Sequence, residues 1–321
     1  MNKLFKLKLF ELASYIREVE LEISKKYHEK KMRCPVHLSV GQELVPAMIG
    51  LLTNKKDLVT SGHRSHAHYL SKGGNLKKMI SEIYGKITGC SSGKGGSMHL
   101  IDTSIGFMGS SSIVGNNIPV GVGLGLGIKF KRQKNISIIY LGDAAVETGT
   151  FFESVNLSII KNLPVLFICE NNRYSVYTNI INRQPKKRKI YKMVEEMNIK
   201  TFHCDGYKIN NVYKILNKSI NEIRKNSKPV FLEFSTYRWL EHCGPDDDTN
   251  LRYRSQKELD FWKKKDPLDK LKKNICKNDK KSEEKVLKIL KKNKQKILSA
   301  FKFAKKSKYP TLKDAFKNLY A

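Results

Sequence analysis

Two polar clusters, each directly after an apolar run, constrain the fold of this chain more than any other feature. Ile136–Leu141 is an unbroken apolar run rich in β-branched residues, and Gly142-Asp143-Ala144 follows it. Pro164–Cys169 is a second such run, and it ends at Glu170-Asn171-Asn172. Short continuous runs of this kind are typical of strands that are buried on both faces of a sheet.

The segment between the two runs has the periodicity of a helix. Thr150–Leu163 carries Phe151, Phe152, Val155 and Ile159 at helical spacing. A strand, a helix and a strand in this order predict a βαβ unit with two parallel strands. We therefore expect an α/β fold, with a mainly parallel sheet and helices on both of its faces. Asp143 and Asn172 would then lie at carboxyl ends of strands, where open α/β sheets bind ligands.

These two side chains offer the oxygen ligands that Mg²⁺ prefers, alongside phosphate oxygens. The irregular turn after Asn172 adds a main-chain carbonyl, for which Tyr174 is our candidate. The pattern therefore predicts a magnesium diphosphate clamped by Asp143, Asn172 and Tyr174. The alternative is an ordinary polar turn beside an asparagine-rich loop.

Gly142-Asp143-Ala144 with Asn171-Asn172 resembles the motif that binds thiamine diphosphate. Over about residues 35–268, the chain resembles the α subunit of 2-oxo acid dehydrogenase E1 components, the pyruvate, branched-chain and acetoin dehydrogenase group. The pieces that match, in the same order, are His37–Glu43 (HLSVGQE), Gly93–His99 (GKGGSMH), Ile113-Val114-Gly115, Leu163-Pro164, Glu170-Asn171-Asn172, Thr236-Tyr237-Arg238, Tyr253-Arg254 and Asp266-Pro267. Ala144 departs from the usual second glycine, and its methyl group is tolerable where φ is negative.

The resemblance implies a set of site residues. The metal ligands are Asp143, Asn172 and Tyr174, and the catalytic candidates are His242 and His66. The residues implied to contact the cofactor are His63, Arg64, Ser112, Val114, Asp143, Ala144, Ala145, Asn172, Tyr174, Arg238 and His242. His63 replaces a tyrosine of the family, although an imidazole can still donate a hydrogen bond to a diphosphate. Cys243 stands where the family has a serine, so phosphorylation there is excluded.

The segment Ser61–His68 contains three histidines in six residues beside Arg64. A forked, permanent cation such as Arg64 suits a phosphate group. The histidines themselves leave two alternatives, a metal site or a polar loop over an active site, and we favour the loop.

The resemblance also implies an activity and its partners. The chain would take part in the oxidative decarboxylation of a small 2-oxo acid, with acyl transfer to a lipoyl-bearing E2 component. A separate β subunit would supply the glutamate that activates the cofactor, within an α₂β₂ heterotetramer. One alternative is an acetoin dehydrogenase-type enzyme, or a split decarboxylase or ketolase that uses no lipoyl partner.

The charge raises an alternative from a different class, a basic nucleic-acid-binding protein. The formal net charge is +31, from 61 basic and 30 acidic residues. The lysines are scattered, with an excess after Trp262, and no DNA- or RNA-binding module is recognisable, so we expect solvated faces rather than a binding patch. The six cysteines are dispersed without metal spacing, which favours a reduced, cytoplasmic setting. No apolar run reaches membrane-span length.

Three segments are expected: an N-terminal helix (1–34), a diphosphate-binding domain (35–255) and a helical, lysine-rich C-terminal segment (256–321). Within the second, a helix from about Pro119 contains Gly121, Gly123, Gly125 and Gly127. Glycine weakens a helix by about 1 kcal/mol relative to alanine. It is tolerated where another backbone must approach closely. The alternative is a poorly formed loop, but the resemblance implies a helix that packs tightly against a second subunit, and we favour the helix.

Overall fold

The predicted βαβ unit lies at the centre of the molecule. The computed structural model describes residues 1–277 and 279–317. In it, β3 (Ser137–Gly142) and β4 (Val165–Asn171) pair in parallel and are joined by α6 (Gly149–Ile160), as predicted. Gly142 pairs with Glu170 in this register, so Asp143 and Asn172 follow neighbouring strand ends.

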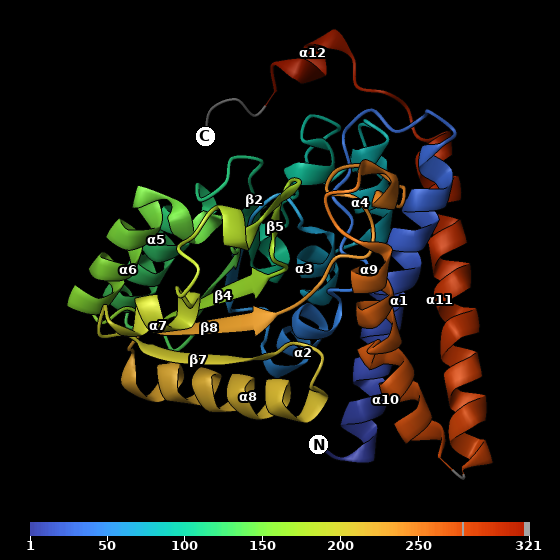
Figure 1. Cartoon of the computed structure of the whole chain (residues 1–321). Coiled ribbons are helices and arrows are strands. Elements are labelled where there is room, and N and C mark those ends of the chain that lie inside the picture. The colour runs from blue at the N-terminus through green and yellow to red at the C-terminus, as the bar shows by residue number, and fades with distance from the viewer. Residues whose placement is uncertain (278, 318–321) are drawn as a thin grey trace.

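Four further strands complete an all-parallel sheet of order β2-β1-β3-β4-β8-β7. Figure 1 shows β4, β8 and β7 side by side in it. They are β1 (Leu58–Ser61), β2 (Phe107–Ser110), β7 (Lys200–Asp205) and β8 (Val230–Ser235). Two short strands, β5 (Tyr174–Ser175) and β6 (Thr178–Asn179), form a separate antiparallel pair. The predicted mainly parallel sheet is confirmed.

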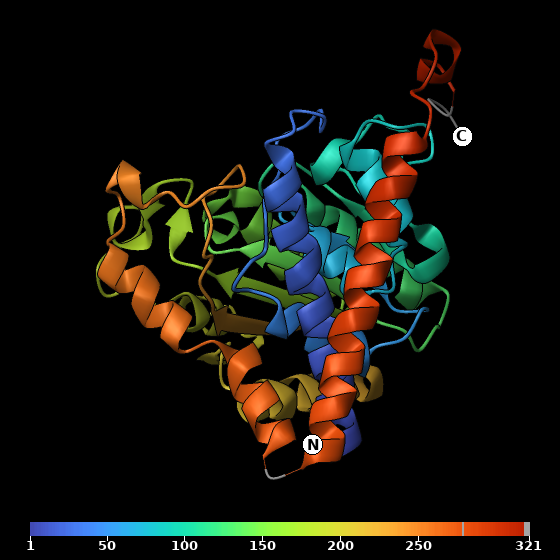
Figure 2. The ribbon, with the colours of Figure 1, turned by 90° about the vertical axis from the view of Figure 1, so that its right-hand side faces the viewer.

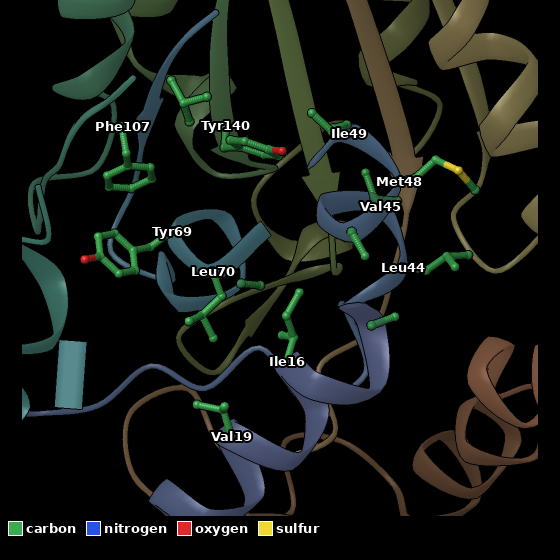
Figure 3. Packing of buried hydrophobic residues seen from close by; sticks show 14 of the residues in the cluster. Ile16, Val19, Leu44, Val45, Met48, Ile49, Tyr69, Leu70, Phe107 and Tyr140 are labelled. Atoms are coloured by element: carbon green, nitrogen blue, oxygen red, sulfur yellow. The ribbon is translucent and has the colours of Figure 1, made fainter. Parts of the chain in front are cut away.

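Helices cover both faces of this sheet, because successive strand residues point to opposite sides. On one face, α5 (Asn117–Phe130), α6 and α7 (Ile190–Glu195) pack on a cluster that includes Ile139 and Phe167. On the other, α2 (Leu44–Leu52), α3 (His66–Ser71), α4 (Leu76–Ile83) and α8 (Ile209–Asn226) share a larger core, which includes Ile138 and Ile168. Figure 3 shows part of that core, where α1 (Lys3–Tyr27) meets α2 and α3.

The C-terminal segment is largely helical, as predicted, through α9 (Gln256–Lys264), α10 (Pro267–Cys276), α11 (Lys280–Lys306) and α12 (Leu312–Ala315). Residues 278 and 318–321 of that segment lie outside the described residues. The long helix α11 runs beside α1, and α1 also packs on α10 (Figure 2). The helices α1, α10 and α11 thus pack together, and the three-part division of the chain stays a prediction.

The analysis of the sequence missed α3, β2 and the β5–β6 pair. The expected loop around Ser61–His68 is helical from His66 onward, where α3 begins, and His66 and His68 are both buried. Apolar periodicity does not reveal such a helix, because all six residues of α3, polar and apolar alike, are buried. β2 was missed because four residues with two glycine or serine positions give too short a pattern. Among the described helices, none has the length and apolar character of a membrane span.

Candidate active site

A cavity of about 210 Å³ opens where β1, β3 and β4 end. Ten of the predicted site residues line it: His63, Arg64, Ser112, Val114, Asp143, Ala144, Ala145, Asn172, Tyr174 and His242. They come from segments far apart in the sequence, and the parallel sheet brings them together. Gly41 lets two of these segments lie close together. Its φ is +94°, and a Cβ there would lie 2.5 Å from the carbonyl oxygen of Tyr237.

Asp143 is the carboxylate at the end of β3, and only 2% of its surface is exposed. Burial raises its pKa, and the opposing attraction comes from the guanidinium of Arg183. Arg183 forms ion pairs with both Asp143 and Glu147. The analysis of the sequence missed Arg183, because the polar loop that carries it has no periodicity. A buried carboxylate that needs a cation is a suitable ligand for a metal ion.

Asn172 and Tyr174 are fixed beside it. The Asn172 Nδ2 donates to Gln42 Oε1 at 3.3 Å, and its Oδ1 accepts the main-chain N–H of Tyr174 at 3.1 Å. The Tyr174 hydroxyl donates to Glu258 Oε2 at 2.7 Å, which holds the turn against α9. The carboxylate, the carboxamide and the main-chain carbonyl of this turn are all hard oxygen ligands, so the donor set fits Mg²⁺.

The departure at Ala144 is accommodated as expected. Its φ is −75° and its ψ is −24°, an ordinary right-handed conformation. The methyl group therefore causes no backbone strain in the turn after β3.

A hydrogen-bonded chain that was not predicted forms one wall of the cavity. The Ser61 hydroxyl lies 2.7 Å from His68 Nδ1, and His68 Nε2 lies 2.9 Å from Glu170 Oε2. The His68 ring also stacks on Tyr140, with centroids 3.7 Å apart. Glu170 Oε1 is buried without a partner among the described residues, so it is a free acceptor at the end of β4. Ser61 ends β1 and His68 lies in the helix that follows. This pair of polar residues on either side of a strand end was the feature of the sequence that could have indicated the contact.

Three further histidines gather at the cavity. The rings of His37, His63 and His242 lie 4.6–5.4 Å apart, centroid to centroid. Burial, and then the positive charge of Arg64, lower the pKa of His37 to about 2, of His63 to about 4 and of His242 to about 3. The three imidazoles are therefore neutral at pH 7. Burial likewise lowers the pKa of Arg64 to about 9, which still leaves it a cation.

The histidines predict a specific response to acid. In the unfolded chain, His37 binds a proton near pH 6.5, whereas in the folded chain it stays neutral to far lower pH. Below pH 6.5 the proton therefore stabilises only the unfolded state, and the free energy of unfolding falls as pH falls. One such group accounts for about 1.4 kcal/mol per pH unit. Between pH 7 and pH 5, His37→Gln should therefore lose about 2 kcal/mol less stability than the wild type. Urea unfolding at both values measures this, with the exposed His203→Gln as control; equal losses in all three proteins would exclude the effect.

Two predicted residues lie outside the cavity lining. His66 is fully buried, and its ring nitrogens face Glu20 Oε2 at 2.9 Å and Ser97 Oγ at 2.7 Å. Arg238 is also fully buried; it pairs with Asp248 and donates to the carbonyls of Leu240 and Val176. The catalytic role of His66 and the cofactor contact of Arg238 stay predictions that this geometry does not favour, because all of these contacts are internal to the fold.

The histidines of Ser61–His68 do not gather into one metal site. Among the described residues, the only group of histidine, cysteine or acidic side chains with the geometry for a metal ion is His37, His63 and His242. His63 thus belongs to a cluster whose other members lie far away in the sequence.

Comparisons with known proteins agree with this geometry. Residues 12–313 match the family model described as dehydrogenase E1 component. The pyruvate dehydrogenase E1 component subunit alpha of Rickettsia bellii is 34% identical over 88% of this chain and 86% of its own length. That of Rickettsia prowazekii is 33% identical over 98% and 95%, respectively. The mitochondrial subunit alpha-1 of Arabidopsis thaliana is 29% identical over 98% of this chain and 79% of its own.

Proposed function

The chain belongs to the dehydrogenase E1 component family, and on this premise we propose that it is the α subunit of a thiamine diphosphate-dependent pyruvate dehydrogenase-type enzyme. Such an enzyme is an oxidoreductase that decarboxylates a 2-oxo acid. The observation that carries the proposal is the pair of oxygen ligands, Asp143 and Asn172, at neighbouring strand ends in one cavity.

In this proposal, Mg²⁺ is held by Asp143, Asn172 and the main-chain carbonyl of Tyr174. Arg64 and His63 lie on the same cavity and would contact the diphosphate, while Ser112 and Val114 would contact the aminopyrimidine end. Thiamine diphosphate supplies the electron sink that decarboxylation of a 2-oxo acid requires. The protein binds and orients the reactants and excludes water from them. Arg183 would have to release Asp143 when the metal enters.

His242 is our candidate for holding or moving a proton near the substrate. It lines the cavity, and its low pKa leaves the imidazole neutral at pH 7, with one nitrogen able to donate and the other to accept. It therefore acts through hydrogen bonds and not as the fixed cation that a charged imidazole would be.

His242→Ala is expected to lower kcat about a hundredfold or more, the usual effect of losing a general acid–base group. The melting temperature should change little, because the ring is not packed in the core. The neighbouring Cys243→Ser, on an exposed side chain, is the matched control. A kcat equal to the wild type, or a fall in melting temperature large enough to explain the lost activity, would contradict the assignment.

We also propose an α₂β₂ assembly, with a β subunit that completes the active site. The glycine-rich helix α5 supports this, because its two glycine faces differ. A Cβ at Gly121 would meet Ile139 at 2.4 Å, and one at Gly125 would meet Val165 at 2.5 Å, so that face packs internally. Nothing lies within 4 Å of a Cβ at Gly123 or Gly127 in the isolated chain. Large apolar side chains are exposed on α5 and on the adjoining α6, namely Val120, Phe130, Phe152, Leu157 and Ile160.

Bulk added to the two faces should have different effects. Gly123→Leu should leave the melting temperature of the isolated chain unchanged and abolish co-purification with the β subunit. Gly121→Leu should destabilise the isolated chain by about 1–3 kcal/mol or more, as overpacking does. Thermal unfolding and gel filtration with the β subunit measure both. Normal assembly of Gly123→Leu would remove α5 from the interface.

We propose that the acyl group passes to a lipoyl-bearing E2 component, and that the enzyme acts in the cytoplasm. The bacterial relatives and the six free cysteines of the chain support the cytoplasmic setting. The acetoin-type and lipoyl-independent alternatives use the same cavity, and a nucleic-acid-binding role has no support in the family membership.

The proposal is tested by assaying CO₂ release from a panel of 2-oxo acids with the co-expressed α and β chains. Release that needs both thiamine diphosphate and Mg²⁺ supports it, whereas no release from any of them opposes it.

A further inference from the structure

The three-histidine cluster is built unlike the other buried histidines of the protein. His66 and His68 each have a hydrogen-bond partner at both ring nitrogens. Within the described part of the chain, no ring nitrogen of His37, His63 or His242 has such a partner. His37 is 94% buried (6% exposed), and its Nδ1 is orphaned. An unpartnered buried nitrogen is unfavourable, so a ligand that these lone pairs can bind is expected.

The geometry favours a metal ion as that ligand. One nitrogen of each ring lies within 4.8 Å of the others, and the ring planes are inclined by 61–85° to one another. A tetrahedral ion with Zn–N bonds of about 2.0–2.1 Å needs nitrogens about 3.3 Å apart. The nitrogens therefore have to move closer together when the ion binds. The neutral state of the rings at pH 7 leaves the lone pairs free.

We propose that His37, His63 and His242 form a binding site for a transition-metal dication of the Zn²⁺ class. Three imidazoles suit Zn²⁺, Co²⁺ or Ni²⁺, whereas Mg²⁺ prefers oxygen ligands. The site therefore differs in chemistry from the magnesium site at Asp143. The ion would bind the cofactor-free chain, because the proposed function uses His63 and His242 for the diphosphate and the substrate. The site depends on His63, because the tyrosine that it replaces in the family has no imidazole nitrogen to bind the ion.

The charges around the cluster indicate that the fourth ligand of the metal is an anion. Arg64 and Arg238 are cations that repel a dication, and Asp248 is the acidic group that opposes them at His242. Arg64 lines the same cavity. A bound anion at the open position of the metal would pair with Arg64 and relieve the repulsion. The ion also joins the segment of His242 to those of His37 and His63, so it fixes one wall of the cavity.

Co²⁺ titration of the full-length chain tests the proposal, because tetrahedral Co²⁺ absorbs visible light. One equivalent should give saturable visible bands, which one equivalent of Zn²⁺ removes and excess Mg²⁺ does not. His63→Tyr and His242→Ala should each weaken Co²⁺ binding at least tenfold. The exposed-histidine control His203→Ala, outside the cavity lining, should bind as tightly as the wild type.

Circular dichroism confirms that each variant is folded. The use of two ligand variants keeps the test informative if one of them is unstable. Absence of saturable bands in the wild type would overturn the site. So would wild-type affinity in both folded ligand variants, or an equal loss in His203→Ala.

Discussion

Asp143→Ala is expected to abolish Mg²⁺-dependent binding of thiamine diphosphate to the assembled α and β chains. Asp143 is the carboxylate at the end of β3, and it lies in the cavity beside Asn172. Loss of an outer partner of a metal ligand typically weakens affinity 10–100-fold, so loss of the ligand itself should weaken binding by more than about a hundredfold. Because burial raises the pKa of Asp143, a proton competes with Mg²⁺ for this carboxylate, and the affinity for Mg²⁺ should fall as pH decreases.

Titration calorimetry with thiamine diphosphate and Mg²⁺ measures this change. The matched control is Asp205→Ala, which removes a carboxylate at the end of β7, outside the cavity lining. Its affinity should equal that of the wild type. Because Asp143→Ala also releases Arg183, gel filtration and thermal unfolding of the variant check that the assembly is intact. Unchanged affinity in Asp143→Ala would show that the metal is held elsewhere.

The isolated chain is expected to show no turnover of 2-oxo acids, even with thiamine diphosphate and Mg²⁺ present. Among the described residues, the carboxylates that line the cavity are Asp143 and Glu170. Asp143 is assigned to the metal, and Glu170 accepts a hydrogen bond from His68 on the same wall. Only one carboxylate oxygen of Glu170, Oε1, is then left without a partner among the described residues, and in this family the β subunit is expected to supply the glutamate that activates the cofactor.

This prediction is measured as CO₂ release by the pure chain, by the β subunit, and by the two mixed. Circular dichroism of the isolated chain establishes that it is folded when inactive. Turnover by the isolated chain at a rate comparable to the mixture would mean that it holds a complete active site.

The central part of the fold was predictable, because continuous apolar runs identify buried strands whatever their neighbours are. The parallel pairing of β3 and β4, and hence the proximity of Asp143 and Asn172, followed from one helix between two such runs. Ala144 was likewise predictable, since a negative φ is the usual conformation.

The remainder depends on contacts between distant segments. His37 and His242 are brought together only by the packing of their loops, and no local pattern signals it. Arg238 was expected at the diphosphate, yet it lies inside the fold, where Asp248 and Tyr253 bind it. A buried arginine and a buried carboxylate look like surface residues when only hydropathy is considered. The helix at His66 was hidden for the same reason.

The account is tested most directly by acyl transfer in the reconstituted enzyme. The chain and its β subunit are incubated with pyruvate, thiamine diphosphate, Mg²⁺ and a lipoyl domain, and the acylated lipoyl product is measured by mass spectrometry. We predict acyl-lipoyl product when both chains are present, and none with either chain alone or with the Asp143→Ala variant. Decarboxylation with no acyl-lipoyl product would contradict the assignment as a dehydrogenase E1 subunit and identify a lipoyl-independent decarboxylase.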